Sequence, residues 1–294
     1  MSAVADRLRL LQRQVGRRST SEPNPGLSGI REQLRRFIAR RQRSQRTLEA
    51  PAGTKLCDGL YVVEERHSST EAADIHLPWS EEGAIPRQRF ICFDTETTGL
   101  AGGVGTKAFM IGTAQWLGAE LVTRQLYLTA LAGEAAMLEA FASALPDDAI
   151  LVSYNGRSYD APLLKGRYRM HRQAHTFEAR THLDLLHPTR RAYRGVWENC
   201  RLITIERHLL GIDRGDDLPG AQAPAAWLAY LRGQENRSLG RVLDHNRSDL
   251  VTLATLLEHF AAQRSCPENG NDTDARTETS IRDREEQTPV MSGG

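Results

Sequence analysis

The chain has 294 residues and a net charge of +1, and 40% of its residues are hydrophobic, which suffices for one large domain or a medium domain with appended segments. No apolar run approaches the ~18 residues of a membrane span, and the N-terminus lacks the apolar core of a signal peptide. The four cysteines are scattered without C-x-x-C spacing, which argues against a zinc ribbon or a disulfide scaffold and favours a reducing compartment. We therefore expect a cytoplasmic protein.

Residues 1–50 are strongly basic, with twelve arginines against four acids. The stretches ADRLRLLQRQVGRR and GIREQLRRFIARRQRS are both typical of basic amphipathic helices, so we predict a basic helical arm. Such an arm suits a polyanionic partner such as nucleic acid, although a solvated arginine-rich helix explains the same residues equally well.

The segment 51–88 is predicted to connect this arm to the main domain, with irregular structure apart from one short strand in GLYVVEERH. At the other end, residues 263–294 are polar and lack aromatic side chains, so we predict a disordered tail.

Residues 89–262 carry the main fold signal. RFICFDTE, AFMIGTAQWL and ELVTRQLYLT are typical of three strands with short connections, which predicts an antiparallel meander. Later elements alternate between helix and strand: GEAAMLEAFASAL, AILVSYN, YDAPLLKGRYRMHR, THLDLL and helical segments near 201–210, 223–232 and 238–262. This order predicts an α/β fold with a mixed sheet, antiparallel strands first and parallel strands after, flanked by helices.

The glycine-rich stretch GLAGGVGTK is not a nucleotide-binding loop by its sequence. A P-loop needs G-x-x-x-x-G-K-[ST] at the start of a helix, whereas the residues after Lys107 alternate like a strand. A dinucleotide-binding loop also needs a following helix. The stretch is either a plain connection between strands or a loop that contacts substrate.

Acidic residues stand at three places where a site is expected. Asp94 and Glu96 are two apart at the end of a buried strand, so both side chains point to one face. Asp160 follows a later strand in YNGRSYDAPLL, where a favourable interaction with a helix N-terminus also explains it. His245 and Asp249 share one face of the last helix, which a solvated helix surface would also explain.

Taken together and in this order, these pieces resemble the three motifs of the DEDD family of 3′–5′ exonucleases, which have a ribonuclease-H-like fold. The resemblance is closest to bacterial YprB-like ribonuclease-H-like domain proteins and covers about residues 89–262. It rests on five stretches: ETTGLAGGVGTKAFMIG, NGRSYDAPLLKGR, HLDLLHPTRR, CRLITIERHLLGIDRGDDLPG and HNRSDLVTLATLL.

The resemblance implies catalytic roles for the acids. Asp94, Glu96, Asp160 and Asp249 would be ligands of two divalent cations. Four close carboxylates repel one another unless cations neutralise them, and oxygen ligands suit Mg²⁺ or Mn²⁺. His245 stands four residues before the last acid, the spacing at which one subgroup has a tyrosine, so it either orients the attacking water or is a locally bonded surface residue.

The resemblance also implies contacts with the substrate strand. Thr97, Thr98, Gly99 and Leu100 begin the loop beside the acids and would hold the terminal base. Asn155 and Tyr159 would contact the terminal nucleotide or brace the site, and Lys107 and Arg157 would contact phosphates unless they are ordinary surface charges. We expect Asp184 to be a structural cap.

The expected function is metal-dependent 3′–5′ exonuclease activity on single-stranded DNA or RNA ends by a two-metal mechanism. Two alternatives remain: a nucleic-acid-binding module of the same fold with weak or no catalysis, and an endonuclease that uses the same metal site.

Overall fold

The structure is a computed structural model, and it describes residues 48–69, 74–80, 83–99, 105–174 and 177–263. The predicted basic arm and the predicted tail lie outside the described residues, apart from their innermost positions 48–50 and 263.

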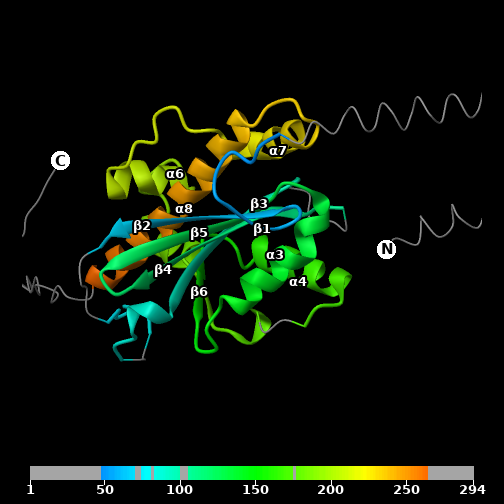
Figure 1. The fold of residues 1–294 in the computed structure, drawn as a ribbon. Helices are drawn as coiled ribbons and strands as arrows, with labels where there is room; N and C mark the ends of the chain where they lie inside the picture. The colour runs from blue at the N-terminus through cyan, green and yellow to red at the C-terminus, as the bar shows by residue number, and fades with distance from the viewer. Residues whose placement is uncertain (1–47, 70–73, 81–82, 100–104, 175–176, 264–294) are drawn as a thin grey trace, which may run out of the picture.

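A seven-stranded mixed sheet forms the centre of the molecule (Figure 1), with the strand order β1-β2-β5-β4-β3-β6-β7. The strands β3, β4 and β5 form the predicted antiparallel meander, and β6 and β7 run parallel to β3. The predicted mixed α/β sheet is therefore confirmed. The strands are β1 (Thr54–Cys57), β2 (Leu60–Ser68), β3 (Phe90–Thr97), β4 (Ala108–Leu117), β5 (Glu120–Leu128), β6 (Ile150–Ser153) and β7 (His182–Asp184).

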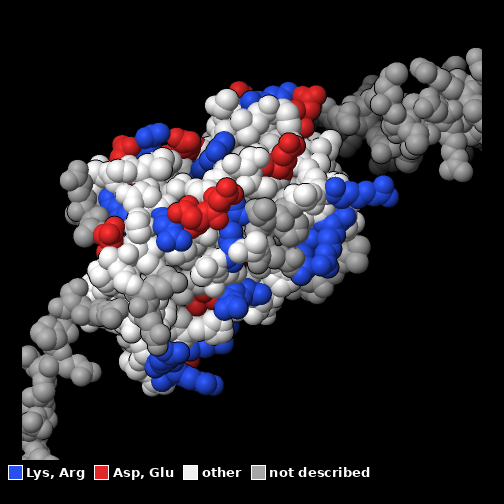
Figure 2. All heavy atoms as spheres, turned by 90° about the horizontal axis from the view of Figure 1, so that it is seen from below, with Lys and Arg blue, Asp and Glu red and all other residues white. Residues whose placement is uncertain are grey.

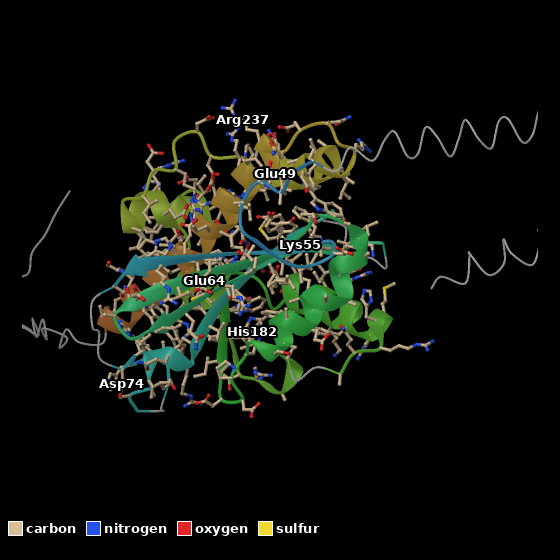
Figure 3. The ribbon with its side chains drawn as sticks, viewed as in Figure 1. Glu49, Lys55, Glu64, Asp74, His182 and Arg237 are labelled. Carbon is tan, nitrogen blue, oxygen red and sulfur yellow. The ribbon has the colours of Figure 1, made fainter. Side chains whose placement is uncertain are left out.

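The segment 51–88 differs from the sequence prediction of one short strand. It contains two strands, and β2 pairs with β5 along its whole length, from Leu60↔Leu128 to Ser68↔Glu120. The sheet thus begins at Thr54, well before residue 89. The strand β1 has four exposed residues and no apolar alternation, which is why its sequence gives no signal. Charged side chains such as Lys55 on β1 and Glu64 on β2 are exposed (Figure 3) and protect this side of the sheet from further strand pairing.

Helices cover both faces of the sheet (Figure 1). On β3, Ile91 and Phe93 belong to a core cluster that includes α3 and α4, whereas Phe90 and Cys92 belong to a second cluster with the later part of α8. Because strand side chains alternate between faces, α3 and α4 lie on one face and α8 on the other. The helices are α3 (Glu134–Ser143), α4 (Asp160–His171), α5 (Leu186–Tyr193), α6 (Leu202–Ile205), α7 (Ala223–Leu231) and α8 (Arg237–Gln263), with a π-helical turn at Glu206–Leu210 and 3₁₀ turns at Arg87–Arg89, Leu131–Gly133, Phe177–Ala179 and Gly220–Gln222.

The helices α3, α4, α7 and α8 match helical segments expected from the sequence, but α5 does not. It is short and has Pro188 in its first turn, a position that a helix tolerates, so its pattern is weak. Within the described ranges, no helix combines the length and apolarity needed to cross a membrane.

Trp227 on α7 anchors the helical layer to the sheet. Its ring is 2% exposed and stacks on Phe109 with ring centroids 4.9 Å apart, and its indole N–H donates to the Leu128 carbonyl at 2.7 Å.

We expect Trp227→Ala to lower the free energy of unfolding by about 3–5 kcal/mol, because it removes a large buried side chain and leaves a cavity. Trp227→Phe keeps the stacking and should cost less. Urea unfolding followed by circular dichroism measures both, and an alanine variant as stable as the wild type would contradict this packing role.

Candidate active site at the open end of the sheet

A crevice opens where β3 and β6 separate. Their parallel pairing runs from Phe90↔Ile150 to Cys92↔Val152, and β3 then continues alone beside β4. Asp94 is the second residue past the last pair. The connection after β3 leads to β4 on one side, and the connection after β6 leads to β7 on the other side. The two connections therefore diverge at this edge of the sheet, and α/β sheets bind ligands at such points.

Three chain segments carry the predicted acids to this crevice. Asp94 and Glu96 lie on β3, on the face that packs against α8, while Asp160 is the first residue of α4 and Asp249 lies on α8. Burial raises the pKa of Asp94 well above its ordinary value, and the charges of Asp249, Asp160 and Glu96 raise it further. The pKa of Glu96 is raised for the same reasons, by burial and then by Asp249 and Asp160. The four carboxylates therefore form one electrostatic cluster.

A buried amide supports Asp94. Asn246 on α8 donates from Nδ2 to Asp94 Oδ2 at 2.8 Å, and its own Oδ1 accepts from Gln125 Nε2 at 2.9 Å. The close approach requires Gly112, which pairs with Asp94 across β3 and β4, since a Cβ there would lie 2.2 Å from Asn246 Oδ1. Sequence reasoning missed Asn246; the only signal was an amide beside His245 on the apolar stripe of the helix.

Asp160 approaches from the other side of the sheet. The Thr95 hydroxyl donates to Asp160 Oδ1, and Thr95 points opposite to Asp94 because strand residues alternate. Burial raises the pKa of Asp160 to about 6, although the hydrogen bond from Thr95 opposes this. A Cβ at Gly156 would lie 2.5 Å from Ser153 Oγ and 3.1 Å from Asp160 Oδ2, so the glycine makes room for the acid.

Asp184 holds the turn that leads to Asp160. Its carboxylate accepts from the backbone N–H groups of Asn155 at 2.7 Å, Arg157 at 3.1 Å and Leu186 at 3.1 Å. Asn155 adopts a left-handed backbone with φ 66°, which these bonds fix. The expected capping role of Asp184 is thus confirmed, and the cap serves both this turn and the start of α5.

An arginine missed by sequence reasoning binds the last acid. Arg214, whose side chain is only 8% exposed, donates to both Asp249 and Glu206, and its Nη1 lies 3.1 Å from Asp217 Oδ2. Glu206 is fully buried and also accepts from Thr252 on α8. Arg214, Glu206 and Asp217 stand in the stretch CRLITIERHLLGIDRGDDLPG, which carried the family resemblance but gave no indication of ion pairing.

His245 faces this network rather than solvent. Its Nδ1 lies 2.6 Å from Asp217 Oδ2, and its Nε2 lies 3.7 Å from Asp249 Oδ2. Burial raises the pKa of Asp217, but the hydrogen bonds and charges of His245 and Arg214 outweigh it and lower the net value. The Asp217 partner, 28 residues away in sequence, holds the ring with Nε2 toward the acid cluster.

The acids fit a metal ion by their chemistry but not by their arrangement in the described residues. In the part of the chain that the structure describes, no group of three or more His, Cys, Asp or Glu side chains is arranged to hold one. Asp94, Asp160 and Asp249 instead bond to Asn246, Thr95 and Arg214. The donor chemistry fits a hard divalent cation, because every candidate ligand is a carboxylate, but the side chains do not close around one.

Six predicted site residues line one cavity of about 230 Å³: Asp94, Thr97, Gly99, Asn155, Tyr159 and Asp160. The Tyr159 side chain is 61% exposed at its rim. The predicted strand contacts Thr98, Lys107 and Arg157 do not line the cavity, and Leu100 lies outside the described residues.

Lys107 takes part in a buried ion cluster instead of standing free for a phosphate. Its Nζ lies 2.9 Å from Oε2 of Glu134, which is 2% exposed and also accepts from Arg167 Nε at 2.5 Å. Burial alone would raise the pKa of Glu134, but hydrogen bonds from Arg167, Lys107 and His171 lower it to about 2. This cluster fastens the end of the loop that precedes β4 to α3 and α4.

A family model and a curated relative identify the superfamily of this chain. A model of the RNase H superfamily matches residues 91–261. The chain is 32% identical over 213 residues to the uncharacterized protein YprB of Bacillus subtilis (strain 168), a match that covers 68% of this chain and 51% of YprB. The chain therefore spans about half the length of this curated relative. Among solved structures, the family B DNA polymerase of the hyperthermophilic archaeon Pyrobaculum calidifontis is similar with a TM-score of 0.49 and 16% identity, over 68% of this chain and 29% of that one.

The chain belongs to the RNase H superfamily. The expected ribonuclease-H-like fold and the resemblance to YprB-like proteins are both confirmed.

Gly112 tests the packing around Asp94. An added methyl would collide with Asn246 Oδ1 and approach Leu250 Cδ1 to 2.7 Å, so we expect Gly112→Ala to lower the free energy of unfolding by about 1–3 kcal/mol. Gly166→Ala on α4 is the control: its Cβ meets nothing within 4 Å, and it should stabilise the helix by about 0.5–1 kcal/mol. Equal effects of the two variants in urea unfolding would refute the close approach.

Glu134 gives a pH-dependent prediction. Its pKa of about 2 in the folded state is below the ordinary 4.5, so its ion pairs contribute stability that is complete above 4.5 and is lost as the pH falls toward 2. We expect Glu134→Gln to cost about 3 kcal/mol at neutral pH, and this cost should shrink between pH 5 and pH 3. Parallel urea unfolding of both proteins at several pH values measures the difference. A cost that stays constant across this range would rule out the lowered pKa.

Proposed function

We propose that this protein is a divalent-cation-dependent 3′–5′ exonuclease that hydrolyses phosphodiester bonds at the ends of single-stranded nucleic acid. The observation that carries the proposal is the convergence of Asp94, Glu96, Asp160 and Asp249 from three separate segments on one crevice, where the charges of Asp249 and Asp160 raise the pKa values of Asp94 and Glu96. Buried acids that repel one another this strongly are typical of functional sites, because a purely structural role gains nothing from the repulsion.

The four carboxylates would hold two Mg²⁺ or Mn²⁺ ions. When bound, such ions activate water as a nucleophile and stabilise the charge on the leaving 3′-oxygen. Arg214 is the cation that offsets the charge of Asp249 in the described arrangement, and it bonds to Oδ1 of that carboxylate, while Oδ2 lies toward His245.

His245 is proposed to orient the attacking water. The bond between His245 Nδ1 and Asp217 fixes the ring, which directs Nε2 toward Asp249 and the crevice. A hydrogen-bonded histidine of this kind can accept the proton that the water loses.

The terminal nucleotide is proposed to occupy the cavity of about 230 Å³ beside the acids. Thr97, Gly99 and Asn155 offer polar groups to it, and the exposed ring of Tyr159 offers a stacking surface at the rim. We do not assign Lys107 to phosphate binding, because it is paired with Glu134. Thr98 and Arg157 stay candidates for contacts farther along the strand.

Nucleic acid as the partner is supported by the places where basic residues gather, since the net charge of the whole chain is only +1. Figure 2 shows Lys and Arg side chains in several clusters on one face. The arginine-rich segment 1–50 would add affinity that does not depend on sequence and that falls with salt. We propose that the catalytic unit extends from β1 to α8 and includes the two strands before residue 89.

One observation favours a second candidate, a nucleic-acid-binding module without efficient catalysis. In the described arrangement Asp249 is paired with Arg214, and no three acids are arranged around a metal. Such a module would bind oligonucleotides tightly in Mn²⁺ without degrading them.

Asp94 is the residue whose replacement tests the proposal. We expect Asp94→Asn to reduce degradation of labelled single-stranded oligonucleotides in Mg²⁺ or Mn²⁺ by on the order of 10³-fold or more, because it removes a proposed ligand. Its stability in EDTA should not fall, since the ionised Asp94 is unfavourable in the folded protein.

Asp216→Asn, an acid with a fully exposed side chain, is the matched control and should degrade oligonucleotides like the wild type. Blocking the 3′ end should stop degradation, and circular single strands should be resistant; cleavage of circles would identify an endonuclease instead. Equal degradation by the Asp94 variant and the wild type would sink the proposal.

A further inference from the structure

A second cavity, of about 820 Å³, lies next to the candidate active site and has no role in the scheme above. Its walls come from Tyr154 and Asn155, which directly follow β6, and from the segment 186–202, which contains α5 and the loop that follows it. Only residues 186–191 and 200–202 of this segment belong to the stretches that carry the family resemblance, and the proposed chemistry uses none of the segment.

The cavity borders the site on two sides. Tyr154 and Asn155 line both this cavity and the cavity that contains Asp94 and Asp160. Arg201 and Leu202 line both this cavity and the one of about 530 Å³ around His245 and Asp249. A chain that leaves the acid crevice past Asn155 therefore enters this cavity directly.

Three arginines distinguish this cavity. Arg190, Arg194 and Arg201 are all exposed, and none of them has an ion pair with a carboxylate in the described ranges. Glu198 is the one acid among the described lining residues, and it lies 3.9 Å from Arg207 and 3.5 Å from His208.

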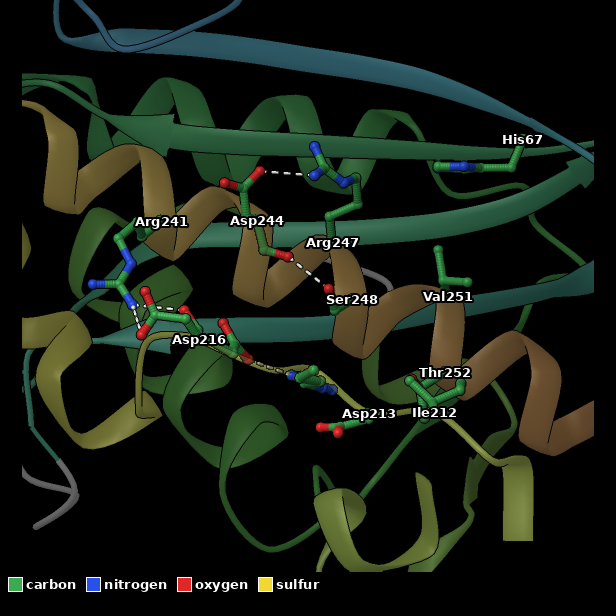
Figure 4. A pocket seen from close by; sticks show the side chains of 12 residues that line it. His67, Ile212, Asp213, Asp216, Arg241, Asp244, Arg247, Ser248, Val251 and Thr252 are labelled. Atoms are coloured by element: carbon green, nitrogen blue, oxygen red, sulfur yellow. Dashed lines mark hydrogen bonds and ion pairs between the residues drawn. The ribbon is translucent and has the colours of Figure 1, made fainter. Parts of the chain in front are cut away.

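The arginines of the cavity shown in Figure 4 differ from these three in having acidic partners. That cavity has a volume of about 440 Å³ and also contains arginines, but each of them already has an acidic partner. Arg241 lies 3.4 Å from Asp216, and Arg247 lies 2.7 Å from Asp244. Those charges are neutralised within the protein, whereas the charges of Arg190, Arg194 and Arg201 face solvent.

The loop that carries Arg194 and Arg201 and follows α5 is held in place. The Tyr154 hydroxyl donates to the Cys200 carbonyl at 2.7 Å, which ties the loop to the end of β6. The Trp197 ring is stacked between Tyr193 at 4.8 Å and His208 at 5.3 Å. A fixed loop binds a ligand at lower entropic cost than a mobile one.

We propose that this arginine-lined cavity binds the phosphate backbone of a single-stranded nucleic acid whose terminal nucleotide lies in the acid crevice. The acids at the crevice repel phosphates, so a strand needs a nearby basic surface to be held there. Arg190, Arg194 and Arg201, which have no acidic partner among the described residues and line a cavity that borders the crevice, supply it. The assignment of the strand end rests on the proposed function, but binding of the strand to this surface can be measured without any hydrolysis.

The test compares two triple variants with the same loss of charge. Arg190→Ala/Arg194→Ala/Arg201→Ala removes the proposed contacts. Arg169→Ala/Arg191→Ala/Arg232→Ala is the control, because these arginines are also exposed but do not line the cavity. Binding of labelled DNA and RNA strands of about 15 nucleotides is measured by fluorescence anisotropy in EDTA over a range of salt concentrations.

We expect the first triple variant to bind at least about tenfold more weakly than the control, with a salt dependence (log Kd against log salt) that is smaller in slope by about 2, as the loss of three phosphate contacts predicts. Turnover of a nucleoside 5′-phosphate aryl ester, which is short enough to occupy the crevice alone, should be the same in Arg190→Ala/Arg194→Ala as in the control, because neither of these two arginines lines the cavities around the acids. Equal affinities and equal slopes for the two triple variants would overturn the proposal.

Arg194→Glu is a second test that does not depend on the triple variant folding. It changes one exposed loop residue and should weaken binding more than Arg191→Glu on the neighbouring helix. If the wild type hydrolyses nothing in Mg²⁺ or Mn²⁺, the proposed function fails, while the binding comparison still decides whether this surface holds the strand.

Discussion

The repulsion among four carboxylates at the end of β3 is the constraint on which the rest of the site depends. Asp94 and Glu96 are buried beside Asp160 and Asp249. Burial and the charges of these two neighbours disfavour the ionised forms of Asp94 and Glu96 and so raise their pKa values. The surrounding residues offset this repulsion by donating a hydrogen bond to each of three acids. Asn246 donates to Asp94, Thr95 to Asp160 and Arg214 to Asp249.

Those donors need supports of their own, and the supports come from the core. Gln125 on β5 orients Asn246, and the fully buried Glu206 anchors Arg214. Two glycines complete the arrangement, since side chains at Gly112 and Gly156 would occupy the space that the site residues need. The polar network thus reaches from the crevice into the sheet and α8, so stability and site geometry depend on the same residues.

The sequence was sufficient for the parts that depend on local pattern. The period of two along β3 placed Asp94 and Glu96 on one face, and apolar runs located the meander, α3, α4 and α8. The residues that bond to the acids could not be predicted from local sequence, because Asn246 and Asp94 are 152 positions apart and Arg214 and Asp249 are 35 apart. No local sequence pattern indicates that Lys107 forms an ion pair with Glu134. None indicates that β1, with four exposed residues, joins the sheet. Pairings of this kind follow from the tertiary fold.

The acids come from different layers of the molecule, and this has a mechanical consequence. Asp249 belongs to the helix on one face of the sheet, Asp160 to a helix on the opposite face, and β3 runs between them. The distance across the crevice is therefore set by the thickness of the sheet and by how closely both helices rest on it. A core substitution under either helix, far from any acid, therefore changes the distance between Asp160 and Asp249 while every site residue stays the same.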